Sequence, residues 1–316
     1  MSALAADPDE LIAASNDGDR RALARAISHV EDDTSIALAL LAGFYTSANR
    51  AVRIGITGAP GSGKSTLTSE LITVIRSQGL SVAVIAIDPS SPFTGGSILG
   101  DRIRMQHHIG DTGVYIRSMS SRGHLGGLSA ATPKVAAVLD GVGFDVVLIE
   151  TVGVGQGEVE IVGEADTTVV VVTPGWGDSI QANKAGLLEI GDVFVVNKAD
   201  RPGAQEAVRD LEGMLDLGSK VAWRPPILEI TATEGTGVDD LWASIQAFGD
   251  HLTSGGSDTR RRARVESTIR WAVRDTVVAR LSSGEIPGLS RSLAAVEQGE
   301  IDPWTAAAHL VEHITH

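Results

Sequence analysis

The 316-residue sequence contains no cysteine, which excludes disulfide bridges and thiolate metal sites. It also lacks any apolar run close to the roughly 18–20 residues that a transmembrane helix needs. The N-terminal segment MSALAADPDELIAA has no basic stretch followed by an apolar core, so it does not read as a secretory signal. These absences favour a cytoplasmic protein that is not inserted in a membrane.

Positive charge is scarce as well. The 26 Lys and Arg residues face 40 Asp and Glu residues, which gives a formal net charge of −14. An acidic protein is repelled by nucleic acids and by anionic membranes, so the charge argues against both as partners. A nucleotide is also an anion, and a site for one must be made locally positive by backbone N–H groups, a lysine and a metal ion.

Residues 51–250 alternate short apolar, β-branched runs with longer polar or amphipathic stretches. The runs predict strands at Val52–Thr57, Val82–Ile87, Val146–Ile149, Thr168–Thr173, Val193–Val196 and Ile227–Thr231, with a weaker one at Val114–Ile116. Continuous apolar strands separated by helical segments indicate an α/β domain whose mainly parallel sheet is covered by helices on both faces. Ligands on such a sheet bind beyond the carboxyl ends of its strands.

The flanking regions read as helical. Residues 1–50 are rich in Ala and Leu at helical spacing, with Asn16 or Asp19 as a candidate cap, and predict an N-terminal helical extension. Residues 251–316 begin with HLTSGGSDT, a Gly/Ser-rich segment that predicts a linker, and continue as a helical C-terminal arm.

A phosphate-binding loop follows the first predicted strand. The strand VRIGIT leads into GAPGSGKS and then into a predicted helix, the context that a P-loop requires. Glycines let successive N–H groups turn toward phosphates, and the helix N-terminus adds partial positive charge. Lys64 is expected to reach the β- and γ-phosphates and the Ser65 hydroxyl to ligate Mg²⁺. The loop comprises Gly58, Ala59, Pro60, Gly61, Ser62, Gly63, Lys64 and Ser65.

Three carboxylates are candidates to complete the magnesium shell, because Mg²⁺ prefers oxygen ligands. Asp88 ends the second strand, where it could instead cap a turn before Pro89; Asp101 lies in a glycine-rich segment, where it could instead be a solvated charge. Glu150 ends VVLIE and begins E-T-V-G, which has the spacing of the GTPase D-x-x-G switch. The N–H of Gly153 would sense the γ-phosphate, and loss of that phosphate would release the loop.

A base-reading motif ends the strand VFVVNKAD. The sequence Asn197-Lys198-Ala199-Asp200 matches N-K-x-D, in which the aspartate accepts the ring N–H and the exocyclic amine of guanine. Adenine offers neither group in that geometry, so the motif favours GTP over ATP. Asn197 is expected to brace the loop and the Lys198 stem to cover the base. A backbone N–H that meets the guanine oxygen, or merely a strand-end turn, is predicted at Thr231, Ala232 and Thr233.

With these motifs in place, the chain resembles the methylmalonyl-CoA mutase-associated GTPases, the MeaB and MMAA group. Long strings carry the resemblance, among them GAPGSGKST (58–66), IDPSSPFTGGSILGDRIRM (87–105), ETVGVGQGE (150–158) and TPGWGDSIQANKAG (173–186). The resemblance implies a GTPase that gates adenosylcobalamin loading and protects methylmalonyl-CoA mutase or a related mutase. It also implies a homodimer formed through the C-terminal arm. The residues that it places in the site are Lys64, Ser65, Thr66, Asp88, Asp101 and Glu150, with Asp178 and Lys184 in a third switch that couples to the mutase.

Other interpretations remain open at this stage. A nickel-inserting metallochaperone GTPase would need clustered ligands, and His107, His108 and His124 are as readily packing or surface residues. An ATPase linked to basic amino-acid transport would not need N-K-x-D, and a P-loop kinase would transfer phosphate to an acceptor other than water. Gln156, just after the predicted switch, could orient the attacking water or be a loop amide. No arginine finger is recognisable, so intrinsic turnover is expected to be slow and to rise with a partner.

Overall fold

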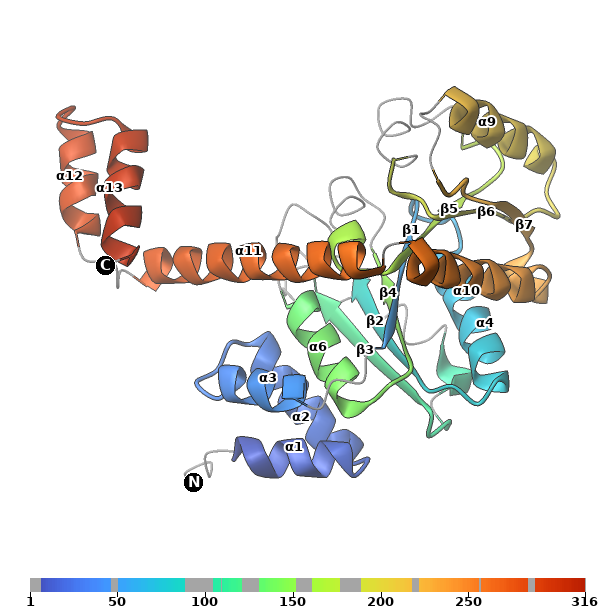
Figure 1. The fold of residues 1–316 in the computed structure, drawn as a ribbon, viewed down its shortest axis with the longest axis horizontal. Helices are drawn as coiled ribbons and strands as arrows, with labels where there is room; N and C mark the ends of the chain where they lie inside the picture. Colours follow the sequence, from blue (N-terminus) through green and yellow to red (C-terminus); the bar gives the residue numbers. More distant parts are fainter. Residues whose placement is uncertain are drawn as a thin grey trace. The chain divides into compact units, whose positions relative to one another are not determined.

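The computed structural model describes residues 7–46, 51–88, 105–108, 110–120, 131–151, 161–176, 189–217, 222–255, 257–283 and 288–315 (Figure 1). The chain forms two compact units, Met1–Arg264 and Val265–His316. In the part of the chain that is described, no helix combines the length and the apolar character needed to cross a bilayer.

A seven-stranded parallel sheet forms the centre of the first unit. Its strands are β1 (Val52–Thr57), β2 (Val82–Asp88), β3 (Val114–Ser120), β4 (Val146–Glu150), β5 (Thr167–Val172), β6 (Val193–Asn197) and β7 (Ile227–Ile230). Their order in the sheet is β3-β2-β4-β1-β5-β6-β7, and every paired neighbour is parallel. The predicted α/β fold with a parallel sheet is therefore confirmed, and β1 is the central strand.

Helices cover both faces of this sheet, as predicted. On one face, α4 (Lys64–Ser77) and α10 (Val238–Gly255) pack on side chains of β1, β2 and β4–β7. On the other face, α6 (Thr132–Val142) packs on β2–β4, and α9 (Ala204–Leu217) packs on β5 and β6. Alternate residues of β4 supply the two cores, with Val147 on one face and Val146 on the other. The apolar runs are continuous because both faces are buried.

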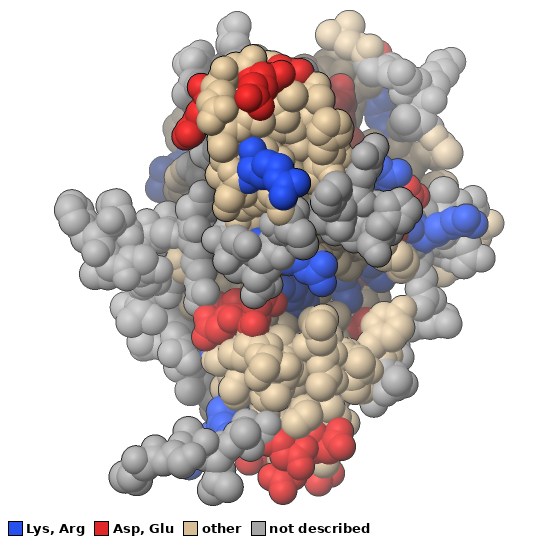
Figure 2. Space-filling model, turned by 90° about the vertical axis from the view of Figure 1, so that its left-hand side faces the viewer, with Lys and Arg blue, Asp and Glu red and all other residues tan. Residues whose placement is uncertain are grey.

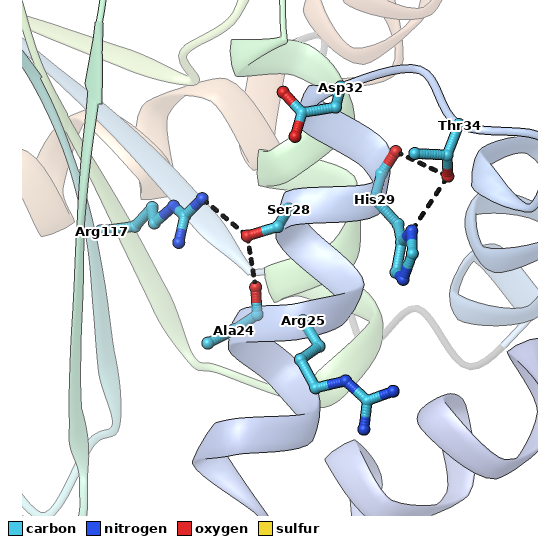
Figure 3. Close-up of a pocket in the computed structure, with 7 residues that line it drawn as sticks. All are labelled: Ala24, Arg25, Ser28, His29, Asp32, Thr34 and Arg117. Atoms are coloured by element: carbon cyan, nitrogen blue, oxygen red, sulfur yellow. Dashed lines mark hydrogen bonds between the residues drawn. The ribbon is translucent and has the colours of Figure 1, made fainter. Parts of the chain in front are cut away.

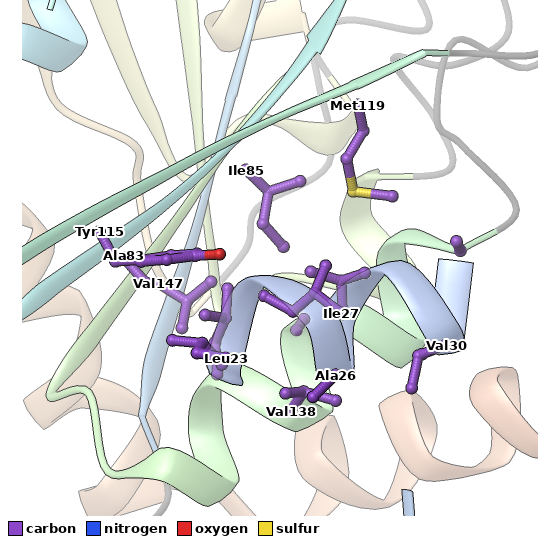
Figure 4. Close-up of a cluster of buried hydrophobic side chains, with 14 of the residues drawn as sticks. Leu23, Ala26, Ile27, Val30, Ala83, Ile85, Tyr115, Met119, Val138 and Val147 are labelled. Carbon is purple, nitrogen blue, oxygen red and sulfur yellow. The ribbon is translucent and has the colours of Figure 1, made fainter. Parts of the chain in front are cut away.

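The N-terminal helices add a further layer over α6. They are α1 (Pro8–Asn16), α2 (Arg20–Glu31) and α3 (Ala37–Thr46). The carboxylate of Asp19 accepts hydrogen bonds from the backbone amides of Arg21 and Ala22, so Asp19 is the N-cap of α2. Five buried residues of α2, together with Val138 of α6, join the core that reaches Ile85 of β2 and Tyr115 of β3 (Figure 4).

Within the described segments, three short 3₁₀ turns lie between the main elements. They are η1 (Gln106–His108) before β3, η2 (Ile161–Gly163) before β5 and η3 (Ala232–Glu234) after β7. Ile161 of η2 is buried against Gly55 of β1, where a Cβ on the glycine would lie 2.3 Å from Ile161 Cγ1. This close approach lets η2 cover the part of β1 that lies between α6 and α9 on the same face.

The segment after residue 250 differs from its prediction. HLTSGGSDT was expected to be a linker, but α10 continues to Gly255 and α11 (Ser257–Ser283) begins two residues later. The hydroxyls of Thr253 and Ser254 donate to the carbonyl oxygens of Asp250 and His251, three residues earlier, and so are satisfied on a helical backbone. The second unit holds the remainder of α11 with α12 (Leu289–Glu297) and α13 (Pro303–Thr315), which pair with each other.

Candidate nucleotide-binding site

The P-loop motif connects β1 to α4 at the carboxyl edge of the central strand. Two of its glycines have positive φ and no room for a side chain. Gly58 has φ +141°, and a Cβ there would lie 2.0 Å from the Val171 carbonyl oxygen. Gly63 has φ +92°, and a Cβ there would lie 2.3 Å from Asn197 Nδ2. Only glycine fits at these two positions, because neighbouring strands approach the loop so closely.

The lysine of the motif is held against its own loop. Lys64 is 6% exposed, and its Nζ donates to the carbonyl oxygens of Gly58, at 2.7 Å, and Ala59, at 3.2 Å. Lys64 is also the first residue of α4, so the ammonium group lies beside a helix N-terminus. An anion bound in the loop would meet the lysine and the helix amides together. The next two residues, Ser65 and Thr66, are buried and half-buried.

Glu150 lies next to this helix because β4 pairs with β1, with Glu150 opposite Ile56. Ser65 Oγ donates to Glu150 Oε1 at 2.6 Å, and Thr68 Oγ1 lies 3.0 Å from Glu150 Oε2. All three side chains are nearly inaccessible, since Ser65 is 5%, Glu150 3% and Thr68 0% exposed. The two residues predicted from separate motifs, Ser65 and Glu150, therefore form one buried pair.

This pair fits a magnesium ion in its donor chemistry. A hydroxyl and a carboxylate are the oxygen ligands that Mg²⁺ takes, usually with substrate phosphates and water completing the shell. Among the residues with described positions, no three His, Asp or Glu side chains gather into a metal site of their own. One hydroxyl and one carboxylate leave room in the shell of such an ion for phosphate oxygens and water.

The base-reading loop is fastened to the P-loop through Asn197, which is 2% exposed at the end of β6. Its Nδ2 donates to the Ser62 carbonyl oxygen at 2.8 Å. Its Oδ1 accepts from the backbone amides of Lys198, at 2.8 Å, and Ala232, at 3.2 Å. One side chain therefore connects the phosphate loop, the N-K-x-D loop and the turn after β7.

Lys198 makes a second connection between the loops. Its backbone is left-handed, with φ +60°, and its Nζ donates to the Gly61 carbonyl oxygen at 2.7 Å. A non-glycine residue in this region carries strain, and such residues cluster at functional sites. Asp200, two residues on, is exposed, which leaves its carboxylate accessible to a base.

Two backbone amides of the turn after β7 donate hydrogen bonds to other groups of the protein. Thr231 N donates to the Thr236 carbonyl oxygen at 3.1 Å, and Ala232 N donates to Asn197 Oδ1. Thr233 follows and is exposed. The predicted tripeptide therefore lies beside the base-reading loop because β6 and β7 are neighbours in the sheet.

Several predicted residues lie outside the described part of the chain. They are Asp101, Gly153, Gln156, His124, Asp178 and Lys184. Asp88 is described by its backbone alone and ends β2, the neighbour of β4, so it lies at the same edge of the sheet as Glu150. The roles predicted for these residues stay predictions.

Two of the three histidines considered for a metal relay pack on α4 instead. His107 Nε2 and His108 Nε2 each lie 3.1 Å from Ser69 Oγ. Burial lowers the pKa of His108, which favours its neutral form. These contacts fix η1 to the helix that follows the P-loop, and they use the imidazoles as packing groups.

A pocket away from the P-loop lies between α2 and β3 (Figure 3). Arg25, His29 and Arg117 are among the residues that line it. Arg117 donates to Ser28 Oγ at 3.1 Å and also pairs with Glu31, which is on α2. Its guanidinium thus joins the N-terminal helices to the sheet.

On the face drawn in Figure 2, acidic and basic side chains are interspersed.

A buried ionic cluster lies at the opposite, amino-terminal edge of the sheet. Arg53 of β1 is 8% exposed and lies 3.6 Å from the Asp140 carboxylate, and its backbone amide donates to Asp166 Oδ2 at 2.9 Å. Arg264 pairs with Asp166. Burial raises the pKa of Glu164 to about 7, although Arg53 and Arg264 oppose the rise. No sequence motif marks this cluster or Thr68.

Known proteins resemble the chain along almost its whole length. A family model for the methylmalonyl-CoA mutase-associated GTPase MeaB matches residues 23–285. A Pyrococcus abyssi protein named as a GTPase is 47% identical over 312 residues, which cover 97% of this chain and 96% of the relative. The mitochondrial methylmalonic aciduria type A homolog of Mus musculus is 32% identical over 273 residues, covering 82% of this chain and 65% of the relative. A crystal structure of a LAO/AO transport system kinase has a TM-score of 0.70 and 27% identity, covering 99% of this chain and 100% of that one.

Proposed function

The chain belongs to the MeaB family of methylmalonyl-CoA mutase-associated GTPases and is a GTP hydrolase, and from this premise we propose a specific role for it. It acts with Mg²⁺ as a chaperone of an adenosylcobalamin-dependent methylmalonyl-CoA mutase or a close relative, gating cofactor loading and protecting the mutase. The observation that most directly supports the hydrolase site is the buried Ser65–Glu150 pair beside Lys64. The family match and the mouse relative support the chaperone role.

The chain's own groups account for phosphate binding. On binding GTP, the Lys64 ammonium would exchange its contacts with the Gly58 and Ala59 carbonyl oxygens for the β- and γ-phosphates. Ser65 and Glu150 would hold Mg²⁺, with Asp88 and Asp101 as further candidates. The bound ion would neutralise charge that develops on the phosphate oxygens. Catalysis here is mainly positioning and charge stabilisation, and water attacks the γ-phosphate.

Guanine selection rests on Asp200. Its exposed carboxylate can accept both guanine N–H groups, and Asn197 fixes the loop that presents it. Because the amides of Thr231 and Ala232 are already engaged, we assign the contact with the guanine oxygen to the amide of Thr233. A hydrogen bond to a charged group contributes about 1.5–3 kcal/mol, so loss of this carboxylate, which accepts two, lowers guanine affinity by at least roughly 10-fold.

Coupling to the mutase uses the segments that change with nucleotide state. Glu150 begins the E-T-V-G segment, and Thr151 Oγ1 donates to Thr57 Oγ1 at 3.0 Å, which ties the start of that segment to the end of β1. Gly153 would sense the γ-phosphate, and Asp178 and Lys184 would carry the signal to the mutase. Slow intrinsic turnover that rises with the mutase follows from the lack of a recognisable arginine finger in the sequence.

The C-terminal unit is proposed to pair with a second copy. Val265, Ile269 and Val273 recur every four residues along α11, and they are 43%, 59% and 59% exposed. Apolar residues at this spacing form one stripe on a helix, and an exposed stripe of that kind is typical of a protein interface. A homodimer would bury this stripe.

The test of the whole proposal is a nucleotide-controlled pull-down from native extract. Wild-type protein and Asp200→Ala are each loaded with GTP, GDP or a non-hydrolysable GTP analogue, and nucleotide affinities are measured in parallel. Recovery of a cobalamin-dependent mutase by the wild type in at least one nucleotide state, with reduced guanine preference in Asp200→Ala, is the expected result.

Each alternative gives a different result in these assays. Preference of the wild type for ATP would overturn the guanine assignment, and phosphate transfer to an acceptor would indicate a kinase. Stoichiometric nickel binding without mutase capture would favour a metallochaperone. Guanine preference with no mutase in any of the three states would refute the chaperone role while leaving the GTPase intact.

A further inference from the structure

Thr68 lies one helical turn after Ser65, on the side of α4 that faces β4. It is fully buried, and its Oγ1 has two acceptors within reach. One is the Lys64 carbonyl oxygen at 2.9 Å, four residues earlier in the same helix, and the other is Glu150 Oε2 at 3.0 Å. Both carboxylate oxygens of Glu150 therefore accept a hydrogen bond from α4, Oε1 from Ser65 and Oε2 from Thr68.

The single hydroxyl proton of Thr68 cannot be given fully to both acceptors. A hydrogen bond to a carboxylate is charge-assisted and about twice as strong as a neutral one. A helix carbonyl four residues earlier also has a backbone N–H as its regular partner. The proton therefore belongs mainly to Glu150, and the contact with Lys64 sets the rotamer from which it is donated.

We propose that Thr68 is a positioning residue of the magnesium site, because it fixes the Glu150 carboxylate in the orientation that accepts the Ser65 hydroxyl proton. This inference rests on the proposed use of Ser65 and Glu150 for Mg²⁺. Because its proton is directed at Glu150 Oε1, the Ser65 hydroxyl would meet a metal ion with its oxygen and not with its proton. Without Thr68, the carboxylate loses its second anchor, and the Ser65 hydroxyl loses a fixed acceptor.

The magnitude follows from what supporting hydrogen bonds contribute at metal sites. Removal of a partner that orients a metal ligand typically weakens metal affinity or activity by about 10- to 100-fold. Thr68→Val keeps the size and the branching of the side chain while it removes the hydroxyl. We expect at least a roughly 10-fold loss of Mg²⁺ affinity in this variant.

The chain offers a matched control on the same helix. Thr73 Oγ1 donates to the Ser69 carbonyl oxygen at 3.3 Å, which is the same bond to the residue four positions earlier, although Thr73 is exposed whereas Thr68 is buried. Thr73→Val thus removes a helix hydroxyl of the same kind whose observed acceptor is a helix carbonyl and not Glu150. Thr68→Ser is the rescue variant, because it keeps the donor.

The experiment titrates Mg²⁺ into the complex of each variant with GDP, by calorimetry and by the dissociation rate of a fluorescent GDP. GDP affinity and thermal unfolding are also measured in EDTA, so that a folding defect is recognised as such. We expect Mg²⁺ binding to be weakened in Thr68→Val and recovered in Thr68→Ser. Thr73→Val should bind Mg²⁺ as the wild type does. In a Glu150→Ala background, Thr68→Val should cause no further loss.

The outcomes separate this inference from the proposal on which it rests. If Mg²⁺ does not tighten GDP binding in the wild type, the magnesium site itself is wrongly assigned. If the wild type shows that effect and Thr68→Val retains it, the positioning role of Thr68 is refuted and the site stands. An additional loss from Thr68→Val in the Glu150→Ala background would refute it equally, because the effect would then not pass through Glu150.

Discussion

Replacement of Glu164 by glutamine is expected to stabilise the chain above neutral pH and to change its stability little in acid. The Glu164 side chain is 5% exposed, just after η2, and its Oε2 has no hydrogen-bond partner among the described residues. Arg53 and Arg264 attract the ionised carboxylate, but burial has the larger effect. Both cations also face other carboxylates, since Arg53 has Asp140 and Asp166 nearby and Arg264 pairs with Asp166.

The size of the effect follows from the pKa of Glu164, which burial raises from 4.5 to about 7. Because the folded chain holds this proton more tightly than the unfolded chain does, stability falls as the pH rises through this interval. At about 1.4 kcal/mol per pKa unit, the ionised form costs roughly 3 kcal/mol above neutral pH. Glutamine resembles the protonated carboxyl in size and cannot ionise, so the variant avoids that cost.

The assay is urea unfolding at a series of pH values from about 4 to 8, at constant ionic strength. The difference in unfolding free energy between Glu164→Gln and the wild type should be small near pH 4 and approach roughly 3 kcal/mol by pH 8. Glu212→Gln is the control, because Glu212 is an exposed glutamate of α9 in the same unit. That control should show little pH-dependent difference from the wild type.

Two results would refute the reasoning. One is a free-energy difference between Glu164→Gln and the wild type that does not change with pH. The other is a carbon-13 titration in which the Glu164 carboxyl, identified by its absence from the variant, titrates at an ordinary glutamate pKa. Either would mean that the two arginines compensate fully for burial.

Three further predictions concern the loops and the arm. Asn197→Ala removes the two bonds that join its loop to Ser62 and Ala232, together with the bond from the neighbouring Lys198 amide. It should weaken GDP binding more than about 10-fold, as calorimetry would measure, because buried partners are left unsatisfied at about 1–3 kcal/mol each. Wild-type affinity would contradict this. In the absence of nucleotide, Gly63→Ala should lower the free energy of unfolding more than Gly61→Ala does. Both glycines have positive φ, but only the Cβ added at Gly63 meets Asn197. Equal losses would show that backbone strain alone matters. In sedimentation, Ile269→Asp should convert the proposed dimer to a monomer, whereas Arg274→Gln should not. A dimer that Ile269→Asp leaves unchanged would exclude the apolar stripe of α11 as the interface.

The sheet could be predicted closely because burial on both faces leaves a simple pattern. Six of the seven apolar runs become strands within one residue of the predicted bounds, and Val52–Thr57 matches β1 at both ends. The weakest prediction, Val114–Ile116, is the edge strand β3, whose four further residues include Arg117 and Ser118. Polar residues are tolerated there because, among the described residues, no further strand pairs with the outer side of β3, and they obscure the pattern.

The prediction of a linker at the Gly/Ser-rich segment HLTSGGSDT was wrong, and the reason lies in the neighbouring helix. Glycine and serine raise the cost of a helix by only about 1 kcal/mol or less per residue. The body of α10, which buries Leu241, Trp242 and Ile245, provides enough packing to carry the helix into HLTSG. Composition reports the local preference, and the packing that overrides it comes from residues a few turns earlier.

The site was predictable as a set of motifs but not as a set of contacts. Spacing identifies Lys64, which follows β1 across the glycine-rich loop, and Asn197, which ends β6 and begins N-K-x-D. Nothing in the sequence near Thr68 or Glu164 distinguishes them from an ordinary helix threonine or a loop glutamate. Their significance depends on which strand lies beside which, and strand order is a property of the whole fold.

Strand order also implies that base recognition and phosphate recognition are energetically coupled. Asn197 donates to the P-loop at Ser62 and accepts from the amide of Ala232, while Lys198 reaches the Gly61 carbonyl oxygen. A shift of either loop therefore strains bonds that hold the other. Residues in one hydrogen-bond network show non-additive effects of about 0.5–3 kcal/mol. Asp200→Ala and Lys64→Ala should accordingly deviate from additivity in their effects on GDP affinity, and the deviation should disappear in an Asn197→Ala background. Strict additivity in the wild-type background would mean that the two loops bind their halves of the nucleotide independently, despite the bonds between them.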